Sequence, residues 1–172
     1  METKSPIEIA FDFISPYAYI GWHRIFAIAE AHGRTVTPVP TLFAGMLNAH
    51  GTKGPAEVPA RRVYAFKDAT RKAHRAGLGR LIPPPSHPFN PLLALRVACI
   101  PMPAVPQRAL IDALYHAAWG GGGGIETPAA VSAAARSVGL DGEALIAQAG
   151  TPEIKERLRK NTESAIARGA FG

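Results

Sequence analysis

Ser15 is the side chain whose place in the sequence most clearly invites chemistry, since it stands where a predicted strand passes into a predicted helix. In the stretch FDFISPYAYIGW, at 11–22, apolar alternation gives way after Pro16 to a helical pattern. A hydroxyl at this point caps the helix, and proline in the first turn loses no hydrogen bond that it needed. Two other predicted helices begin with the same pattern, at Thr127-Pro128 and Thr151-Pro152. A capping role alone is therefore enough to explain Ser15.

A catalytic role for Ser15 is the alternative, because it follows the first strand of a strand–helix–strand unit. Ligands gather at the carboxyl ends of strands in open α/β sheets, and helix N-termini favour anions. The hydroxyl could donate a hydrogen bond to a thiolate that a bound cofactor supplies. Such a bond, together with the helix dipole, would lower the thiol pKa by about one to three units. Thioredoxins carry a reactive cysteine at this junction, whereas here the positions read Ser15-Pro16-Tyr17-Ala18, which excludes disulfide exchange.

The elements that must position Ser15 can be read from the apolar pattern around it. Alternating apolar residues predict a strand over 7–13, and a helical pattern follows over 16–32, ending before Gly33. The segment 34–43 predicts a second strand, which its two prolines confine to an edge or cut short. Strand, helix and strand in this order imply a right-handed parallel βαβ unit.

The rest of the chain shows helical patterns only. They occur at 57–76, 90–100, 105–119, 128–138, 142–149 and 152–168. The proline-rich segment LIPPPSHPF, at 81–89, predicts an irregular loop between the first two of these helices. The sequence thus indicates an α/β fold with a large helical region after the βαβ unit.

The overall composition limits the class of protein. Hydrophobic residues make up 47% of the chain and charged residues 19%, proportions that are typical of globular proteins. No apolar run approaches the roughly 18 residues that span a bilayer, and the N-terminus lacks a signal-peptide pattern. We therefore expect a cytoplasmic protein without a membrane partner. The single cysteine, Cys99, is expected in the core, and the six scattered histidines predict no metal site.

The net charge of +6 raises the question of an anionic partner. Seven basic residues lie in or beside the first helix after the βαβ unit: Arg61, Arg62, Lys67, Arg71, Lys72, Arg75 and Arg80. A solvated helix face and a site for an acidic small molecule are both compatible with this pattern. Nucleic acid is not expected as a partner, because stacking aromatic residues are sparse here and no binding motif is present.

A family resemblance rests on several segments in order along the chain. FDFISPYAYIGW resembles the opening of the 2-hydroxychromene-2-carboxylate isomerases, DsbA-like proteins related to kappa-class glutathione transferases. The likeness continues through TLFAGMLNAHGTKGPAEVPARRVYAFKD, HPFNPLLALR, DALYHAAW and ARGAFG. It implies a thioredoxin-like (DsbA-like) domain at 1–50 and 151–172, interrupted by an all-helical insertion at 51–150.

The resemblance also implies glutathione as the cofactor. The positions that match the family's glutathione site are Ser15, Pro16, Thr52, Arg61, Arg62, Phe89 and Asn90. Ser15 matches the serine that faces the glutathione sulfur, while Thr52 replaces the usual asparagine. One of the two arginines is expected to pair with a carboxylate of glutathione or substrate. Asn90 could instead cap the next helix.

The reaction implied by the resemblance is the cis–trans isomerisation of a hydroxybenzylidene pyruvate, an aromatic carboxylate, through addition and elimination of the glutathione thiol. Such chemistry needs electrostatic stabilisation of an enolate and room for an aryl ring. Tyr17, Trp22 and Tyr64 are candidate walls for that ring, although each could pack in the core instead.

The end of the sequence departs from the family pattern. In the family, ARGAFG leads into Val-Pro-Thr, two further strands and a last helix. Because the sequence ends at Gly172, we expect a C-terminally truncated chain without the last strands of the sheet, or one that a partner chain completes, with a homodimer as the candidate assembly. Two alternative functions stay open: a kappa-like glutathione transferase, and a non-catalytic relative that binds anions through its basic helix.

Overall fold

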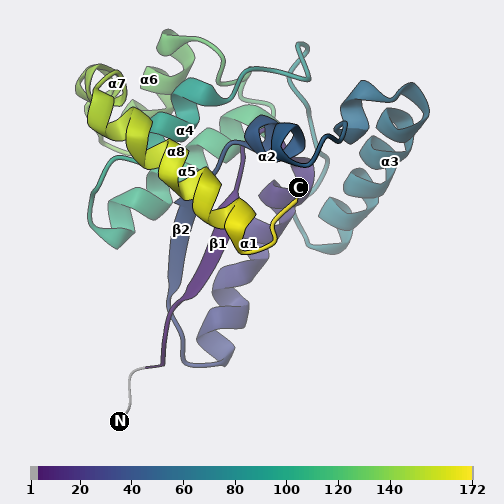
Figure 1. Ribbon diagram of the computed structural model, residues 1–172, viewed down its shortest axis with the longest axis horizontal. Coiled ribbons are helices and arrows are strands. Elements are labelled where there is room, and N and C mark those ends of the chain that lie inside the picture. The colour runs from purple at the N-terminus through teal and green to yellow at the C-terminus, as the bar shows by residue number, and fades with distance from the viewer. Residues whose placement is uncertain (1–3, 172) are drawn as a thin grey trace.

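The sheet of this protein consists of two parallel strands joined by a helix. The computed structural model describes residues 4–171. In it β1 (Ile7–Phe11) pairs with β2 (Val36–Pro40) in a register that runs from Ile7 opposite Val36 to Phe11 opposite Pro40. Helix α1 (Pro16–Ala31) connects them (Figure 1). The predicted parallel βαβ unit is confirmed, and β2 ends at its second proline.

Helix α1 has the boundaries that its capping residues predict. Ser15 has extended backbone angles, and its Oγ accepts a hydrogen bond from the Ala18 amide at 3.2 Å. At the other end Gly33 has φ of +61° and donates to the carbonyl of Glu30 at 2.9 Å, as a glycine after a helix commonly does. Thr127 and Thr151 cap α6 (Pro128–Ser137) and α8 (Pro152–Ala167) in the same way, so all three caps are confirmed.

Four more helices lie where the apolar patterns predict them: α3 (Pro59–Arg75), α4 (Leu92–Ala98), α5 (Ala104–Trp119) and α7 (Gly142–Ala149). Helix α2 (Phe43–Ala49) and the 3-10 turn η1 (Pro55–Glu57) were not predicted. Helix α2 has no side-chain cap of its own. Instead, the amides of Leu42 and Phe43 donate to Thr162 Oγ1 at 3.0 Å and to Asp12 Oδ2 at 2.8 Å. Because both acceptors are distant in sequence, no local signal marks where α2 begins.

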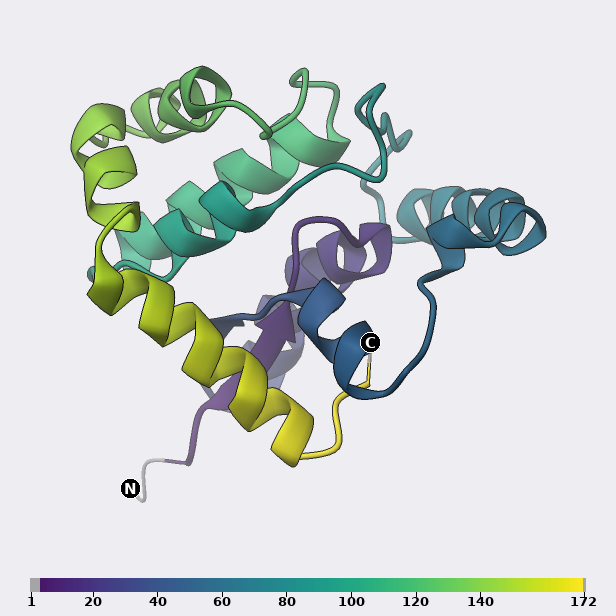
Figure 2. The ribbon, with the colours of Figure 1, turned by 45° about the horizontal axis from the view of Figure 1, so that its top comes forward.

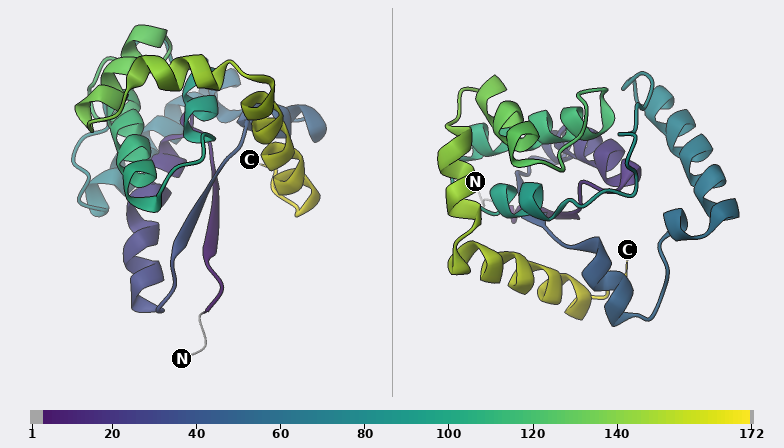
Figure 3. Two further views of the ribbon diagram at one scale, coloured as in Figure 1. Left: turned by 90° about the vertical axis from the view of Figure 1, so that its left-hand side faces the viewer. Right: turned by 90° about the horizontal axis from the view of Figure 1, so that it is seen from above.

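The helices cover both faces and one end of the small sheet. Helix α1 lies on one face and α8 on the other, as the edge-on view shows (Figure 3, left). Helices α4 to α7 form a cluster beyond the end at which the chain leaves the strands (Figure 2). Helix α3 projects from this body, with η1 and α1 as its main neighbours (Figure 1). The carboxyl ends of the strands thus face a region bounded by α2, α3 and the start of α1.

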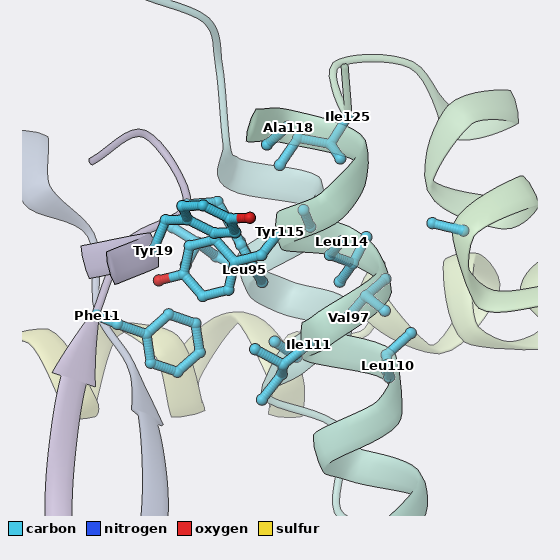
Figure 4. Packing of buried hydrophobic residues seen from close by; sticks show 14 of the residues in the cluster. Phe11, Tyr19, Leu95, Val97, Leu110, Ile111, Leu114, Tyr115, Ala118 and Ile125 are labelled. Atoms are coloured by element: carbon cyan, nitrogen blue, oxygen red, sulfur yellow. The ribbon is translucent and has the colours of Figure 1, made fainter. Parts of the chain in front are cut away.

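Aromatic residues dominate the core between the sheet and α5. Tyr115 is fully buried, with its ring centroid 5.8 Å from that of Phe11 and 5.7 Å from that of Tyr19 (Figure 4). The ring centroid of Phe13 lies 4.7 Å from it. Cys99 is buried as predicted, and burial raises the pKa of its thiol to about 12. Residues from the predicted thioredoxin-like part and from the predicted insertion belong to one continuous core. The division of the chain at 50 and 151 stays a prediction.

Candidate active site

A cavity of about 1170 Å³ lies where the chain leaves β1 and β2. Its walls come from the β1–α1 loop, from α2 and the segment after it, from the start of α3, from residues 87–92, and from residues 170 and 171. These elements surround the carboxyl end of β1 in the tilted view (Figure 2). Sites for small molecules commonly have volumes of roughly 300 to 1000 Å³, so this cavity can hold a tripeptide together with a second small ligand.

Ser15 lies in this cavity with its hydroxyl proton unused. Its Oγ accepts from the Ala18 amide, and its own amide donates to the Asp12 carbonyl at 3.2 Å. Among residues 4–171, no acceptor for the hydroxyl proton lies within hydrogen-bond distance. The first residues of α1 also line the cavity, so the positive end of the helix dipole faces the same space. The site can therefore donate one hydrogen bond to an anionic atom at the helix N-terminus.

Eight of the ten residues proposed from the sequence line this single cavity: Ser15, Pro16, Tyr17, Thr52, Arg61, Arg62, Phe89 and Asn90. Asn90 also has the alternative role, because its Oδ1 accepts from the Leu92 amide at 3.0 Å, at the start of α4. Arg62 donates to the carbonyl of His87 at 2.9 Å, which fixes its guanidinium at the wall. The two arginines and Lys53 make the α3 side of the cavity cationic, with Glu57 among them.

Tyr17 and Tyr64 flank a second, shallower hollow of about 400 Å³ beside the cavity. Tyr17 and Arg61 belong to the walls of both spaces, whereas Tyr64 lines the hollow only and is largely exposed. The Tyr17 hydroxyl donates to Asp68 Oδ2 at 2.8 Å, and Lys72 Nζ lies 5.0 Å from its ring centroid. Partial burial and the adjacent Asp68 carboxylate raise the pKa of Tyr17 to about 12, so the phenol stays protonated.

Trp22 does not line either space, which corrects its assignment as a candidate substrate wall. It lies on the face of α1 that packs on the sheet and α5, where it is fully buried against Phe11 and Tyr115. Its indole Nε1 donates to Asp112 Oδ1 at 2.6 Å. The core alternative is the one the structure shows, because the Trp22 ring packs on Phe11 of the sheet and on Tyr115 of α5.

Two titratable residues beside Ser15 escaped the sequence reasoning. Asp12 is 5% exposed and lines the cavity, and its carboxylate accepts from the amides of Ile14 at 3.0 Å and Phe43 at 2.8 Å. Burial raises its pKa to about 6, although the two N–H bonds oppose the shift. His87 is 8% exposed and lines the cavity, and burial lowers its pKa. Both belong to segments that carried the resemblance, FDF and HPF, but no spacing rule singles them out.

Comparison with known proteins decides the family. The family described as DSBA-like thioredoxin domain matches residues 6–172. The chain belongs to the DsbA-like thioredoxin domain family. Among curated proteins it is similar to human glutathione S-transferase kappa 1, with 23% identity over 96% of this chain and 77% of that one. It is also similar to glutathione S-transferase kappa 2 of Caenorhabditis elegans, with 27% identity over 100% of this chain and 80% of that one.

A solved structure supports the fold of this DsbA-like chain. A 2-hydroxychromene-2-carboxylate isomerase superposes with a TM-score of 0.83 and 24% sequence identity, covering 96% of this chain and 81% of the other. The thioredoxin-like fold inferred from the sequence, with its large helical content, is therefore confirmed. None of the helices within residues 4–171 is long and apolar enough to cross a membrane. Over the same residues, no three His, Cys, Asp or Glu side chains gather as a metal site would require.

Proposed function

We propose that this DsbA-like protein binds glutathione with its thiol over Ser15 and catalyses cis–trans isomerisation of an aromatic carboxylate of the 2-hydroxychromene-2-carboxylate or hydroxybenzylidene pyruvate type. The observation that carries the proposal is a hydroxyl with a free proton at the N-terminus of α1, inside a cavity lined by Arg61 and Arg62. The names of the similar proteins, an isomerase and two glutathione transferases, support the same chemistry.

The side chains of the cavity suit glutathione. The tripeptide carries two carboxylates and one ammonium group, so it needs more cations than anions in its site. Lys53, Arg61 and Arg62 supply three cations, and the exposed Glu57 supplies a carboxylate that an ammonium group could approach. Ser15 supplies the donor for the sulfur. Two of the groups named here have other partners already, since Arg62 donates to His87 and Glu57 accepts from Gly54 at 2.7 Å. Lys53 and Arg61 are therefore the groups we expect to meet the carboxylates.

When bound, glutathione supplies a thiolate that adds to a conjugated double bond, so that the bond can rotate before the thiol leaves. The contribution of Ser15 is to hold the sulfur as an anion by a hydrogen bond that is worth about 1.5–3 kcal/mol to a charged acceptor. Tyr17 and Tyr64 form an aromatic hollow of a size that suits an aryl ring, and Arg61 borders both this hollow and the cavity. Arg61 therefore stands between the two ligands, where a guanidinium that pairs with a glutathione carboxylate also stabilises negative charge that develops on the substrate beside it.

The test compares Ser15→Ala with Thr127→Ala. Both changes remove a hydroxyl that caps a helix, at 3.2 Å from the amide it accepts from, and each should cost about 1 kcal/mol of stability. Only Ser15→Ala should raise the pKa of bound glutathione, measured as thiolate absorbance against pH, by about one to two units. It should also lower isomerase kcat at neutral pH by tenfold or more. Absence of glutathione binding in calorimetry, or equal turnover in the two variants, would overturn the proposal.

A kappa-like glutathione transferase is the second candidate, favoured by the two kappa-class relatives. The Ser15 site would activate the thiol in the same way, and the two activities differ only in whether the adduct leaves. Product analysis with an aryl enone acid separates them, because a transferase accumulates the conjugate while an isomerase returns free glutathione. Binding of anions without either product would instead indicate the non-catalytic relative.

A further inference from the structure

Three side chains from separate parts of the chain hold the backbone that leads from β1 to Ser15. The carbonyl of Phe13 accepts from the indole Nε1 of Trp119 at 2.7 Å. The amide of Ile14 donates to Asp12 Oδ1, and the carbonyl of Ile14 lies 3.2 Å from Nε2 of His87. Buried backbone groups must find partners, and a turn between strand and helix has no ladder to provide them. The amide and the carbonyl of Ile14, the residue before Ser15, are therefore both hydrogen-bonded to buried side chains.

The surroundings of His87 fix its charge and its tautomer. Its imidazole lies among the rings of Phe66, Phe89 and Trp119, with centroid separations of 5.0, 5.8 and 5.4 Å. To bond the Ile14 carbonyl, Nε2 must carry the proton. Nδ1 is buried and has no hydrogen-bond partner among residues 4–171, so a second proton there would be an unpaired buried donor. Burial lowers the pKa of His87, and the Arg62 guanidinium acts in the same direction, against the bond to the Ile14 carbonyl, which raises it. Together with the unpaired Nδ1, this favours the neutral ring.

The backbone of His87 reaches the opposite wall of the cavity. Its carbonyl accepts from the Arg62 guanidinium at 2.9 Å, while its imidazole bonds the Ile14 carbonyl. His87 thus links the β1–α1 loop, which leads to Ser15, to Arg62 at the start of α3. Arg62 and Ser15 both line the cavity, so the distance between them depends on this link.

We propose that His87 is a positioning residue for Ser15: its neutral imidazole, bonded to the Ile14 carbonyl, holds the serine hydroxyl at the orientation that meets the bound sulfur. This inference rests on the proposed function for its effect on turnover, but the hydrogen bond itself can be tested without any ligand. The Ile14 carbonyl belongs to the peptide group that joins Ile14 to Ser15. A tilt of this peptide group therefore redirects the Ser15 hydroxyl and the first amides of α1 together. Electrostatic stabilisation falls steeply when a donor is displaced from its acceptor.

Two substitutions at His87 separate the hydrogen bond from the packing. His87→Phe keeps a ring among the three aromatic neighbours but removes the donor, whereas His87→Gln keeps a side-chain N–H that can reach the Ile14 carbonyl. Trp22→Phe is the matched control, because it removes an equally buried ring donor, bonded to Asp112, on a face of α1 that does not touch the cavity. The readouts are hydrogen–deuterium exchange of the segment 13–19 in ligand-free protein, the thiol pKa of bound glutathione, and kcat and KM for the aryl enone acid.

We expect His87→Phe to speed exchange in the segment 13–19 about tenfold more than in α5 and to lower kcat about tenfold, with KM changed less than threefold. His87→Gln should recover most of both losses, and Trp22→Phe should affect neither.

The proposal is overturned if Phe and Gln at position 87 behave alike, or if Trp22→Phe reproduces the loss of kcat. Should His87→Phe not fold, the ¹⁵N chemical shifts of His87 in the native protein decide. A proton on Nδ1 and not on Nε2 refutes the hydrogen bond from His87 to the Ile14 carbonyl. If glutathione does not bind at all, the proposed function fails, while the exchange and tautomer results still test the hydrogen bond from His87 to the Ile14 carbonyl.

Discussion

The carboxylate of Asp12 should make the stability of this protein fall as pH rises from about 4 to about 6. The side chain ties the end of β1 to the start of α2, since it accepts from the Ile14 and Phe43 amides. Burial raises its pKa from 3.8 to about 6 in the folded state, so between these values the folded chain holds a proton that the unfolded chain has released. Stability falls with pH wherever the folded state binds more protons. A shift of about two units, at about 1.4 kcal/mol each, makes the loss about 3 kcal/mol over the whole titration, of which about 2 kcal/mol falls between pH 4 and pH 6.

The assay is urea denaturation of wild type and Asp12→Asn at intervals from pH 4 to pH 7. Subtracting the two curves removes every other titrating group, His87 included, and the difference in unfolding free energy should change by about 2 kcal/mol between pH 4 and pH 6.5. Asp141→Asn is the control for loss of a carboxylate, because Asp141 caps α7 at the surface and asparagine caps as well. A difference that stays flat over this range would show that Asp12 ionises normally in the folded protein, and that its burial is offset by partners other than the two amides.

Two further predictions concern stability away from the cavity, and calorimetry or denaturant unfolding checks both. Tyr115→Phe should raise the free energy of unfolding by about 1 kcal/mol, because the buried hydroxyl has no hydrogen-bond partner among residues 4–171; a loss of similar size would reveal a bound water. Gly142→Ala should cost about 2 kcal/mol, since the new Cβ would lie 2.4 Å from Ser132 Oγ at the contact of α6 with α7. A Cβ added at Gly21, inside α1, would meet no atom within 4 Å, so Gly21→Ala should instead raise the free energy of unfolding by up to about 1 kcal/mol. Equal effects of the two glycine substitutions would contradict the packing described here.

The parts of the fold that the sequence predicted are those whose signals are local. A cap bonds an amide three residues away, so Ser15, Thr127 and Thr151 announce their helices in the sequence itself. The end of β1 was predicted at 13 but lies at Phe11, and the Phe13 carbonyl bonds an indole 106 residues further along the chain instead of a neighbouring strand. The apolar alternation continues through Phe13, which is buried, but the strand pairing does not.

The candidate site was found through the resemblance for most of its lining and through local chemistry only for Ser15. The sequence pattern did not predict the side chains that hold the backbone before Ser15. Asp12 meets Phe43 across 31 residues and His87 meets Ile14 across 73, and these separations leave no periodic trace in the sequence. Trp22 was misassigned for the related reason that an aromatic residue near the site can turn inward or outward. The rotation of α1 settles that choice, and it is fixed only once α1 packs on β1 and α5.

A general reason connects these outcomes. Before Ser15 the chain leaves the sheet at Phe11, so the Ile14 amide and the carbonyls of Phe13 and Ile14 have no partners in the sheet. Local residues can supply one partner, as Asp12 does, but the geometry of a tight turn keeps other nearby side chains away from the remaining carbonyls. In this chain the remote donors Trp119 and His87 supply the partners that the two carbonyls need. In a DsbA-like chain with serine at this junction, the buried ring N–H groups that face the turn are the place to look for residues that control the hydroxyl without touching the ligand.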